Sequence, residues 1–200
     1  MDSGPDKPFV SRAGLKLDAA LNAFGLTPAG WNCADLGSHV GGFVDCLLAG
    51  GAQRVYSIDT AYGTLAWSLR RDPRVVVMER TNALHAVLPE AVDLVTIDVG
   101  WTPQRLILPA AARMLKPGGR IVSLLKPHYE APRERLRRGV LPPEDLPQVA
   151  QGVLDDLTNL GIELLGRIDS PLRGHGGNVE VLLHLRPIRP VISLWRRRGP

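Results

Sequence analysis

The sequence predicts an α/β protein with a Rossmann-like, mostly parallel seven-stranded sheet and helices on both faces of that sheet. From Asn32 onward, segments that suit strands alternate with segments that suit helices, the pattern of βαβ units in a parallel sheet. Runs such as Val75–Val77 and Leu94–Ile97 are apolar without alternation, as expected for strands buried on both faces. The length of 200 residues and the hydrophobic content of 44% suit one domain with a normal core.

The elements are predicted in chain order. Ser11 is expected to cap a leading helix that runs to about Phe24, with Leu17 and Leu21 on one face, and Gly25 ends that helix. Strands are predicted at Asn32–Leu36, Arg54–Ile58, Arg74–Met78, Val92–Ile97, Arg120–Leu125, Ile162–Ile168 and Val179–Arg186. Later helices are predicted near Phe43–Ala49, Tyr62–Arg70, Pro103–Leu115 and Glu144–Leu160.

Three segments are expected to lie outside the regular elements. Residues 1–9 are interpreted as a flexible start, which leaves 10–186 as the domain and 187–200 as a basic tail rich in Pro and Arg. In that tail, the cluster Arg196–Arg198 could contact phosphate, and Trp195 needs something to cover it. Residues 126–143 hold four prolines and four arginines, and suit either a mobile basic loop on the ligand side of the sheet or a solvated surface excursion.

A glycine-rich turn, Ala34–Phe43, predicts a ligand site. It suits the end of a buried strand, a tight turn and the start of a helix. Gly37 lets a ligand approach the main chain, and the free N–H groups from about Gly42 onward favour a negative or hydrogen-bond-accepting ligand group. Asp59 ends the next strand, about 20 residues on, where an acidic residue can hold ribose hydroxyls.

The spacing within this turn argues against a dinucleotide. The pattern Asp35-x-Gly37-x-x-x-Gly41 differs from G-x-G-x-x-G and looks more like the turn of enzymes that use S-adenosylmethionine (SAM), where no pyrophosphate is held. The alternative is an ordinary strand–helix turn followed by an unrelated Asp59. The turn and Asp59 together favour a cofactor that contains a nucleoside.

Composition narrows the function classes. A net charge of +4 mildly favours an anionic partner such as RNA, while an aromatic content of 5% argues against base stacking as the main binding mode. Cys33 and Cys46 suit buried thiols in a reducing compartment, and the five histidines show no ligand spacing, so no metal is expected. Without a signal peptide or a long apolar run, a cytoplasmic protein that does not span a membrane is expected.

Four charged residues lie at the edges of apolar segments. Asp98 and Lys126 each follow a strand, and because carboxyl ends of strands face the ligand crevice, both are expected to point into it. Glu180 begins the last strand and Lys16 lies on the leading helix. The alternatives are a helix cap or a loop salt bridge for Asp98, and solvated side chains for Glu180 and Lys16.

Short motifs along almost the whole chain resemble one family. They run in order from Val10 to Arg186 and include Val10–Leu17, Gly42–Leu48, Asp59–Trp67, Asp72–Val75, Glu79–Asn82, Thr96–Val99, Leu125–Pro127 and Gly177–Glu180. The sequence resembles the methyltransferase domain of the TlyA (hemolysin A) family, which belongs to the FtsJ/RrmJ-like RNA ribose 2′-O-methyltransferases. This resemblance implies a class I SAM-dependent methyltransferase fold, and RNA, most simply ribosomal RNA or a ribosomal subunit, as the partner.

The resemblance also implies roles for particular residues. FtsJ-like enzymes use a Lys-Asp-Lys-Glu tetrad, and the matching positions are Lys16, Asp98, Lys126 and Glu180. SAM is expected to contact the turn and its neighbours, with Thr81 and Asn82 near the adenine: Asp35, Gly37, Ser38, Gly41, Gly42, Phe43, Asp59, Thr81, Asn82 and Asp98.

Two departures from the family affect how RNA is held. TlyA proteins usually carry an N-terminal S4-type RNA-binding domain, for which 200 residues leave no room, so a separate partner could supply RNA binding. The segment Gly100–Pro103 differs from the usual Ser-Phe-rich turn next to the target nucleotide.

Lys126 is the candidate to activate a ribose hydroxyl. It would act either as a base, which requires a large depression of its pKa, or as a charged group that stabilises the forming alkoxide. Asp98 would orient Lys126 and the hydroxyl, and Glu180 would hold Lys16 or the ribose. A methyltransferase for a small molecule and a non-catalytic RNA- or ribosome-binding module remain the alternatives.

Overall fold

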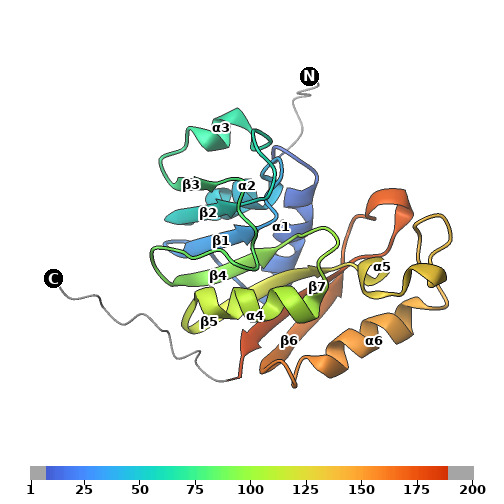
Figure 1. Ribbon diagram of the computed structural model, residues 1–200. Helices are drawn as coiled ribbons and strands as arrows, with labels where there is room; N and C mark the ends of the chain where they lie inside the picture. Colours follow the sequence, from blue (N-terminus) through green and yellow to red (C-terminus); the bar gives the residue numbers. More distant parts are fainter. Residues whose placement is uncertain (1–7, 189–200) are drawn as a thin grey trace.

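A computed structural model describes residues 8–188 and contains a seven-stranded sheet in the order β3-β2-β1-β4-β5-β7-β6 (Figure 1). β7 pairs antiparallel with β5 and β6, and the other pairs are parallel. The strands are β1 Asn32–Leu36, β2 Arg54–Ile58, β3 Val75–Met78, β4 Val92–Ile97, β5 Leu115–Leu125, β6 Ile162–Asp169 and β7 Val181–Pro187. The helices are α1 Ala13–Phe24, α2 Gly42–Ala49, α3 Trp67–Arg70, α4 Gln104–Met114, α5 Pro127–Glu130 and α6 Leu146–Asp156.

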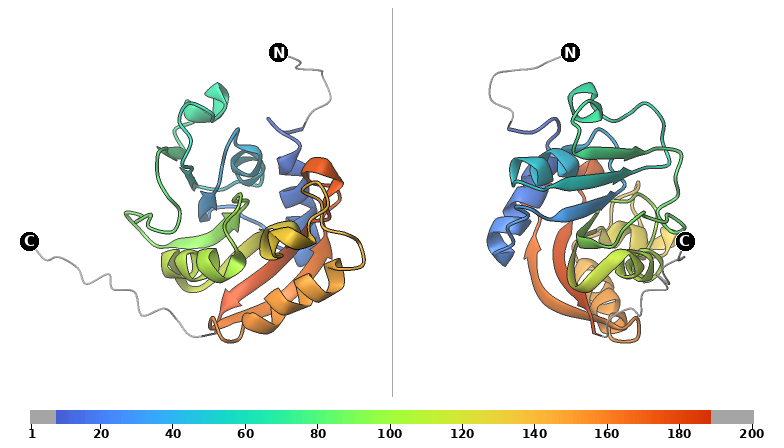
Figure 2. Two further views of the ribbon diagram at one scale, coloured as in Figure 1. Left: turned by 45° about the vertical axis from the view of Figure 1, so that its right-hand side comes forward. Right: turned by 90° about the vertical axis from the view of Figure 1, so that its left-hand side faces the viewer.

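Helices cover both faces of the sheet, with α1 and α2 on one face and α4 and α6 on the other (Figure 2). Successive residues of a strand point to opposite faces, so each strand feeds both layers. On β1, Cys33 packs with Leu17 of α1 and Val44 of α2, whereas Ala34 packs in the layer that contains Ile107 of α4. The predicted fold class is therefore confirmed.

The start of α1 differs from its prediction. Ser11 was expected to cap the helix, but the helix begins at Ala13, after Arg12, and no side chain caps it. The Ser11 hydroxyl instead packs against Gly42, at the start of α2. The Ser11 side chain therefore contacts the start of α2 and does not cap α1.

The predicted helix over residues 62–70 is also wrong at its start, because only Trp67–Arg70 is helical. Gly63 has a φ of +73°, in the left-handed region, and its N–H donates to Glu79 Oε1 at 2.9 Å. A long-range contact therefore holds the segment before α3 in a loop. The other helices begin and end within a few residues of their predicted bounds.

β5 is longer than predicted. It begins at Leu115, which pairs with Val92, and the register shifts before Leu94 pairs with Arg120. The segment Lys116–Gly119, which separates the predicted helix at Pro103–Leu115 from the predicted strand at Arg120–Leu125, is a local irregularity within β5. The predicted flexible residues at 1–7, and most of the predicted tail including Trp195 and Arg196–Arg198, lie outside the described residues.

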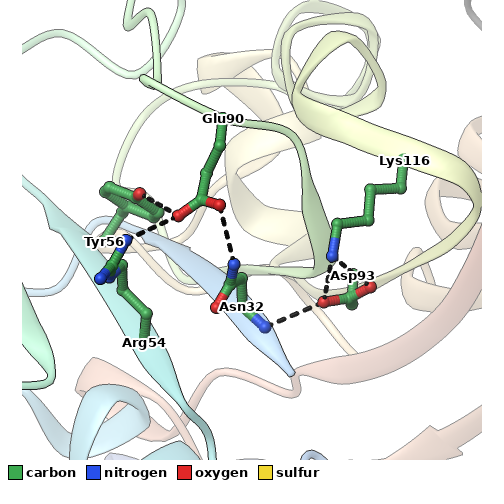
Figure 3. Close-up of polar contacts among 6 residues, drawn as sticks. All are labelled: Asn32, Arg54, Tyr56, Glu90, Asp93 and Lys116. Carbon is green, nitrogen blue, oxygen red and sulfur yellow. Dashed lines mark hydrogen bonds and ion pairs between the residues drawn. The ribbon is translucent and has the colours of Figure 1, made fainter. Parts of the chain in front are cut away.

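A polar network ties together the first residues of the central strands, at the edge opposite their carboxyl ends (Figure 3). Glu90 Oε1 accepts from the Tyr56 hydroxyl at 2.6 Å, and Glu90 Oε2 accepts from Asn32 Nδ2 at 3.0 Å. Asp93 accepts from the Asn32 N–H at 2.9 Å and pairs with Lys116. These contacts fix the strands relative to one another at their amino ends. The carboxyl ends of the strands are left to the loops that follow them.

Both cysteines, Cys33 and Cys46, are buried free thiols, as predicted. Burial raises the pKa of each thiol to about 12. In the described part of the chain, every helix is too short or too polar to cross a bilayer.

Candidate active site

A cavity of about 740 Å³ opens at the carboxyl ends of the parallel strands. It lies where β1 and β4 are neighbours, so the chain order reverses there, and open α/β sheets bind ligands at such a point. Its walls come from the segments that follow β1 to β5 and from Ser11 and Ala13 at the start of α1. Nine of the ten residues predicted to contact a cofactor line the cavity, and Gly41 does not.

The glycine turn is built so that its backbone faces the cavity. Gly37 has a φ of +89°, and a Cβ there would lie 2.6 Å from the Asp98 carbonyl oxygen, so a side chain is excluded. Gly41 has a φ of +102° and packs against Leu65 and Leu69. The role of Gly41 here is close packing behind the turn, in contrast to its predicted place against a ligand.

Asp59 holds the turn in position. Its Oδ2 accepts from the His39 N–H at 2.7 Å, and its Oδ1 accepts from the Ala61 N–H at 2.8 Å. The same carboxylate lines the cavity at the end of β2, where Thr81 and Asn82 also contribute to the wall. Its remaining lone pairs can accept hydrogen bonds from hydroxyl groups in the cavity.

Asp35 is the most deeply buried acid of the site. Its Oδ1 accepts from the Thr96 hydroxyl at 2.7 Å, while its Oδ2 is buried without a hydrogen-bond partner among the described residues. Burial raises the pKa of Asp35 to about 7, and the nearby Asp98 and Asp59 add to this effect. A buried carboxyl oxygen on a cavity wall is suited to a cation or a hydrogen-bond donor that enters the cavity.

Asp98 and Lys126 meet on the cavity wall. Lys126 Nζ lies 2.5 Å from Asp98 Oδ1 and donates to the Val99 carbonyl oxygen at 3.1 Å. Their side chains are 21% and 13% exposed, so the pair is largely desolvated yet reachable from the cavity. The prediction that both residues point into the same crevice is supported by this contact.

Lys16 and Glu180 form a second ion pair, between α1 and the residue before β7. Their side chains are only 7% and 4% exposed, which excludes the alternatives of a solvated lysine and a solvated edge carboxylate. Neither residue lines the cavity. The four predicted catalytic residues thus form two ion pairs, one on the cavity wall and one behind it.

Two aromatic residues at the cavity were not predicted. Trp101 is 69% exposed, has a φ of +59° and packs against Tyr129, with ring centroids 4.5 Å apart and the ring planes tilted by 33°. The guanidinium carbon of Arg133 lies 6.0 Å from the Trp101 ring. The low aromatic content argued against aromatic contacts to a ligand. The sequence feature that could have indicated Trp101 is its position three residues after Asp98.

These features define a class of protein, one with the class I methyltransferase fold and an acidic cavity at its switch point. A comparison with protein families matches residues 9–187 to the FtsJ-like methyltransferase family, and the chain belongs to that family. This confirms the family resemblance and the enzyme class at the level of the family. The fold extends to distant enzymes, such as the N-methyltransferase NodS of Bradyrhizobium japonicum, at a TM-score of 0.59 and 18% identity.

Closer relatives carry names that concern ribosomal RNA. The 16S/23S rRNA (cytidine-2′-O)-methyltransferase TlyA of Mycobacterium tuberculosis is 41% identical over 90% of this chain and 69% of its own length. YqxC of Bacillus subtilis, assigned as an rRNA methyltransferase, is 41% identical over 88% of this chain and 65% of its own length. The chain therefore spans about two-thirds of the length of these curated relatives.

A solved structure agrees with the sequence comparison. A protein of Lactococcus lactis assigned as a hemolysin superposes with a TM-score of 0.85 at 40% identity, covering 89% of this chain and 88% of that one.

Proposed function

We propose that this protein is a SAM-dependent methyltransferase that methylates a ribose 2′-hydroxyl of ribosomal RNA. The observation that carries the proposal is the Lys126–Asp98 ion pair on the wall of the cavity that the glycine turn and Asp59 also line. The names of the relatives support ribosomal RNA as the substrate.

The residues of the cavity fit SAM. The cofactor carries a positive sulfonium and an ammonium group, and three acids, Asp35, Asp59 and Asp98, line the cavity. The unpartnered Oδ2 of Asp35 would accept from the cationic end, while Asp59 would accept from ribose hydroxyls. When bound, SAM supplies an electrophilic methyl group for in-line displacement by an oxygen nucleophile.

Lys126 would act on the nucleophile as an ammonium. Lys126 Nζ lies 2.5 Å from Asp98 Oδ1 on the cavity wall, where an ammonium group can stabilise a forming alkoxide. Asp98 would orient Lys126 and hold the ribose hydroxyl by accepting its hydrogen bond. Lys16 and Glu180, buried behind the wall, would contribute by fixing α1 against the end of the sheet.

The exposed Trp101 ring favours a nucleotide over a small aliphatic substrate. A base can stack on an aromatic side chain, and Arg133 beside it carries a charge that phosphate would neutralise. A small-molecule substrate would leave both groups without a function.

The test is methyl transfer from labelled SAM to ribosomal subunits and to free ribosomal RNA. Lys126→Ala is expected to lower turnover about 100-fold or more while SAM binding is retained, because the stabilising charge is lost and the cofactor wall is not. Lys116→Ala is the matched control, since Lys116 also pairs with an aspartate but at the opposite edge of the sheet.

The outcomes separate the candidate functions. Incorporation that depends on Lys126 and not on Lys116 supports the proposal. SAM binding without incorporation into any RNA would indicate a small-molecule substrate or a non-catalytic role, and no SAM binding would overturn the assignment of the cavity.

A further inference from the structure

An arginine-bearing hairpin follows α5. Arg137 and Val140 pair through two backbone hydrogen bonds of 2.8 and 3.1 Å, and the two residues between them, Arg138 and Gly139, have φ angles of +53° and +81°. This is a tight two-residue turn in the left-handed region. The segment from Arg133 to Leu141, called the arginine hairpin below, carries Arg133, Arg135, Arg137 and Arg138.

The side chain of Asn178 binds this hairpin from the other side of the loop region. The Leu141 N–H donates to Asn178 Oδ1 at 3.1 Å, and Asn178 Nδ2 donates to the Gly139 carbonyl oxygen at 3.1 Å. The carboxamide thus pairs with the groups on either side of Val140, as a peptide unit of a neighbouring strand would. A carboxylate of the same shape accepts but cannot donate, so only one of the two bonds would survive in an aspartate.

The backbone of Asn178 belongs to the segment that leads to Glu180. The Gly174 N–H donates to the Asn178 carbonyl oxygen at 2.9 Å, and Gly174 lies so close to the Glu180 carboxyl group that a Cβ would collide with it. Glu180 in turn pairs with Lys16 of α1. In both Figure 1 and Figure 2 the loop before β7 lies beside the loop after α5.

The charge of the arginine hairpin indicates the kind of ligand that it can contact. Arg137 pairs with Glu144 at 3.3 Å in an exposed contact, and the Arg135 side chain donates to the neutral Gln148. Arg133 lies beside the Trp101 ring at the cavity. The hairpin therefore presents an excess of positive charge next to the cavity, which suits a phosphate backbone.

We propose that Asn178 is a positioning residue that holds the arginine hairpin against the segment carrying Glu180, and so sets where an RNA backbone lies relative to Lys126. The proposal rests on the proposed function and adds to it a residue that touches neither the cofactor cavity nor the reacting atoms. Asn178 acts through the hairpin, because its carboxamide is buried and bonded to backbone.

The test uses Asn178→Asp and Asn178→Ala in the full chain, with Gln148→Ala in α6 as the matched control, because Gln148 contacts the same hairpin. Asn178→Ala is expected to speed hydrogen exchange at the Leu141 amide, whereas Asn178→Asp keeps an acceptor for that amide and loses only the bond to the Gly139 carbonyl oxygen. Both variants are expected to raise KM for ribosomal RNA about tenfold. The KM for SAM and kcat at saturating RNA are expected to stay near wild type. Gln148→Ala is expected to change none of these, because Gln148 bonds to the Arg135 side chain and not to the hairpin backbone.

Measuring RNA affinity independently of methyl transfer separates this test from the test of the proposed function. If wild type binds ribosomal RNA but transfers no methyl group, the proposed function fails, and the affinities of the Asn178 variants for that RNA still decide the role of Asn178. Unchanged exchange at Leu141 in Asn178→Ala would show that Asn178 does not hold the arginine hairpin. Faster exchange with unchanged RNA affinity, or an equal loss of SAM and RNA affinity, would overturn the positioning role.

Discussion

At the scale of single residues, the site separates two lysine–acid pairs by their access to the cavity. Lys126 and Asp98 lie on the cavity wall, where a ligand can reach them, whereas Lys16 and Glu180 are enclosed. A buried ion pair contributes little net stability but is costly to break, since removal of one partner leaves an uncompensated charge. We therefore infer that Lys126 acts on substrate and that Lys16 acts through the packing of α1.

The burial of Asp35 makes the stability of the protein depend on pH. Burial raises the pKa of Asp35 from 3.8 to about 7, so the folded state of the protein favours the neutral carboxyl group. The resulting contribution to the free energy of unfolding is complete below pH 3.8 and is lost as the pH rises from 3.8 to about 7. Asp35→Asn removes the charge and should raise the free energy of unfolding at pH 8 by on the order of 3 kcal/mol. SAM affinity should fall in the same variant, because a carboxylate partner for the cationic end is lost.

Urea unfolding at pH 5 and pH 8 checks the stability of Asp35→Asn, and calorimetry with SAM checks its binding. Equal stabilisation of the variant at both pH values would contradict the assigned titration. Thr96→Val is a useful comparison, since it removes the hydroxyl that bonds to Asp35 Oδ1 and the Ala34 carbonyl oxygen but leaves the carboxyl group in place.

At the scale of elements, the sequence predicted strands better than it predicted loops and helix starts. Strands such as β1 and β4 are mostly apolar and buried on both faces, and their bounds were predicted correctly. The start of α3 depends on a bond from Gly63 to Glu79, and that of α1 on the contact of Ser11 with Gly42. Such long-range contacts leave no local pattern in the sequence.

The same limit applies to the site. Gly37, Asp59 and Asp98 were predictable because each directly follows a strand, and every parallel strand ends at the same edge. The pairing of Lys16 with Glu180 joins residues 164 positions apart and came only from the family resemblance. Trp101 and Tyr129 meet because two neighbouring strands end side by side, which no periodicity reports.

The start of α4 depends on a residue from another element. Pro103 precedes the helix and no local side chain caps it, but Glu130 Oε1 of α5 accepts from the Gln104 N–H at 2.8 Å. Glu130→Ala should therefore lower the free energy of unfolding by about 1 kcal/mol, the typical cost of a lost cap. Glu130→Gln should recover most of that loss, because it keeps an acceptor oxygen.

Thermal and urea unfolding of both Glu130 variants measure this effect, with Glu134→Ala as the control on the exposed turn at residues 133–135. If Glu130→Ala and Glu134→Ala lose the same stability, the contact with Gln104 does not cap α4. The result bears on function as well, since the cap ties the segment after Asp98 to the segment after Lys126.

At the scale of the whole molecule, two buried groups with opposite charge preferences balance each other. Burial, with a smaller effect of Lys126, lowers the pKa of His128 from 6.5 to about 4. The folded state therefore favours neutral His128, a contribution present above pH 6.5 and lost as pH falls toward 4. Asp35 has the opposite dependence across nearly the same range. Between about pH 4 and 6.5 the folded and unfolded chains differ by no net proton at these two sites.

This balance predicts that Asp35 and His128 together cause little change in wild-type stability with pH over that range. When one of the two groups is removed, the effect of the other on stability should become measurable. In His128→Gln, stability relative to wild type should fall with rising pH by about 1.4 kcal/mol per pH unit, because of these two groups only Asp35 then titrates differently in the folded and unfolded states. In Asp35→Asn it should rise with pH by a similar amount, and the double variant should return to the wild-type slope. Urea unfolding at pH 4.5, 5.5 and 6.5 measures these slopes, with the exposed His85→Gln as control. Single variants that keep the wild-type slope would show that the burial of Asp35 and the burial of His128 do not have opposing effects on stability.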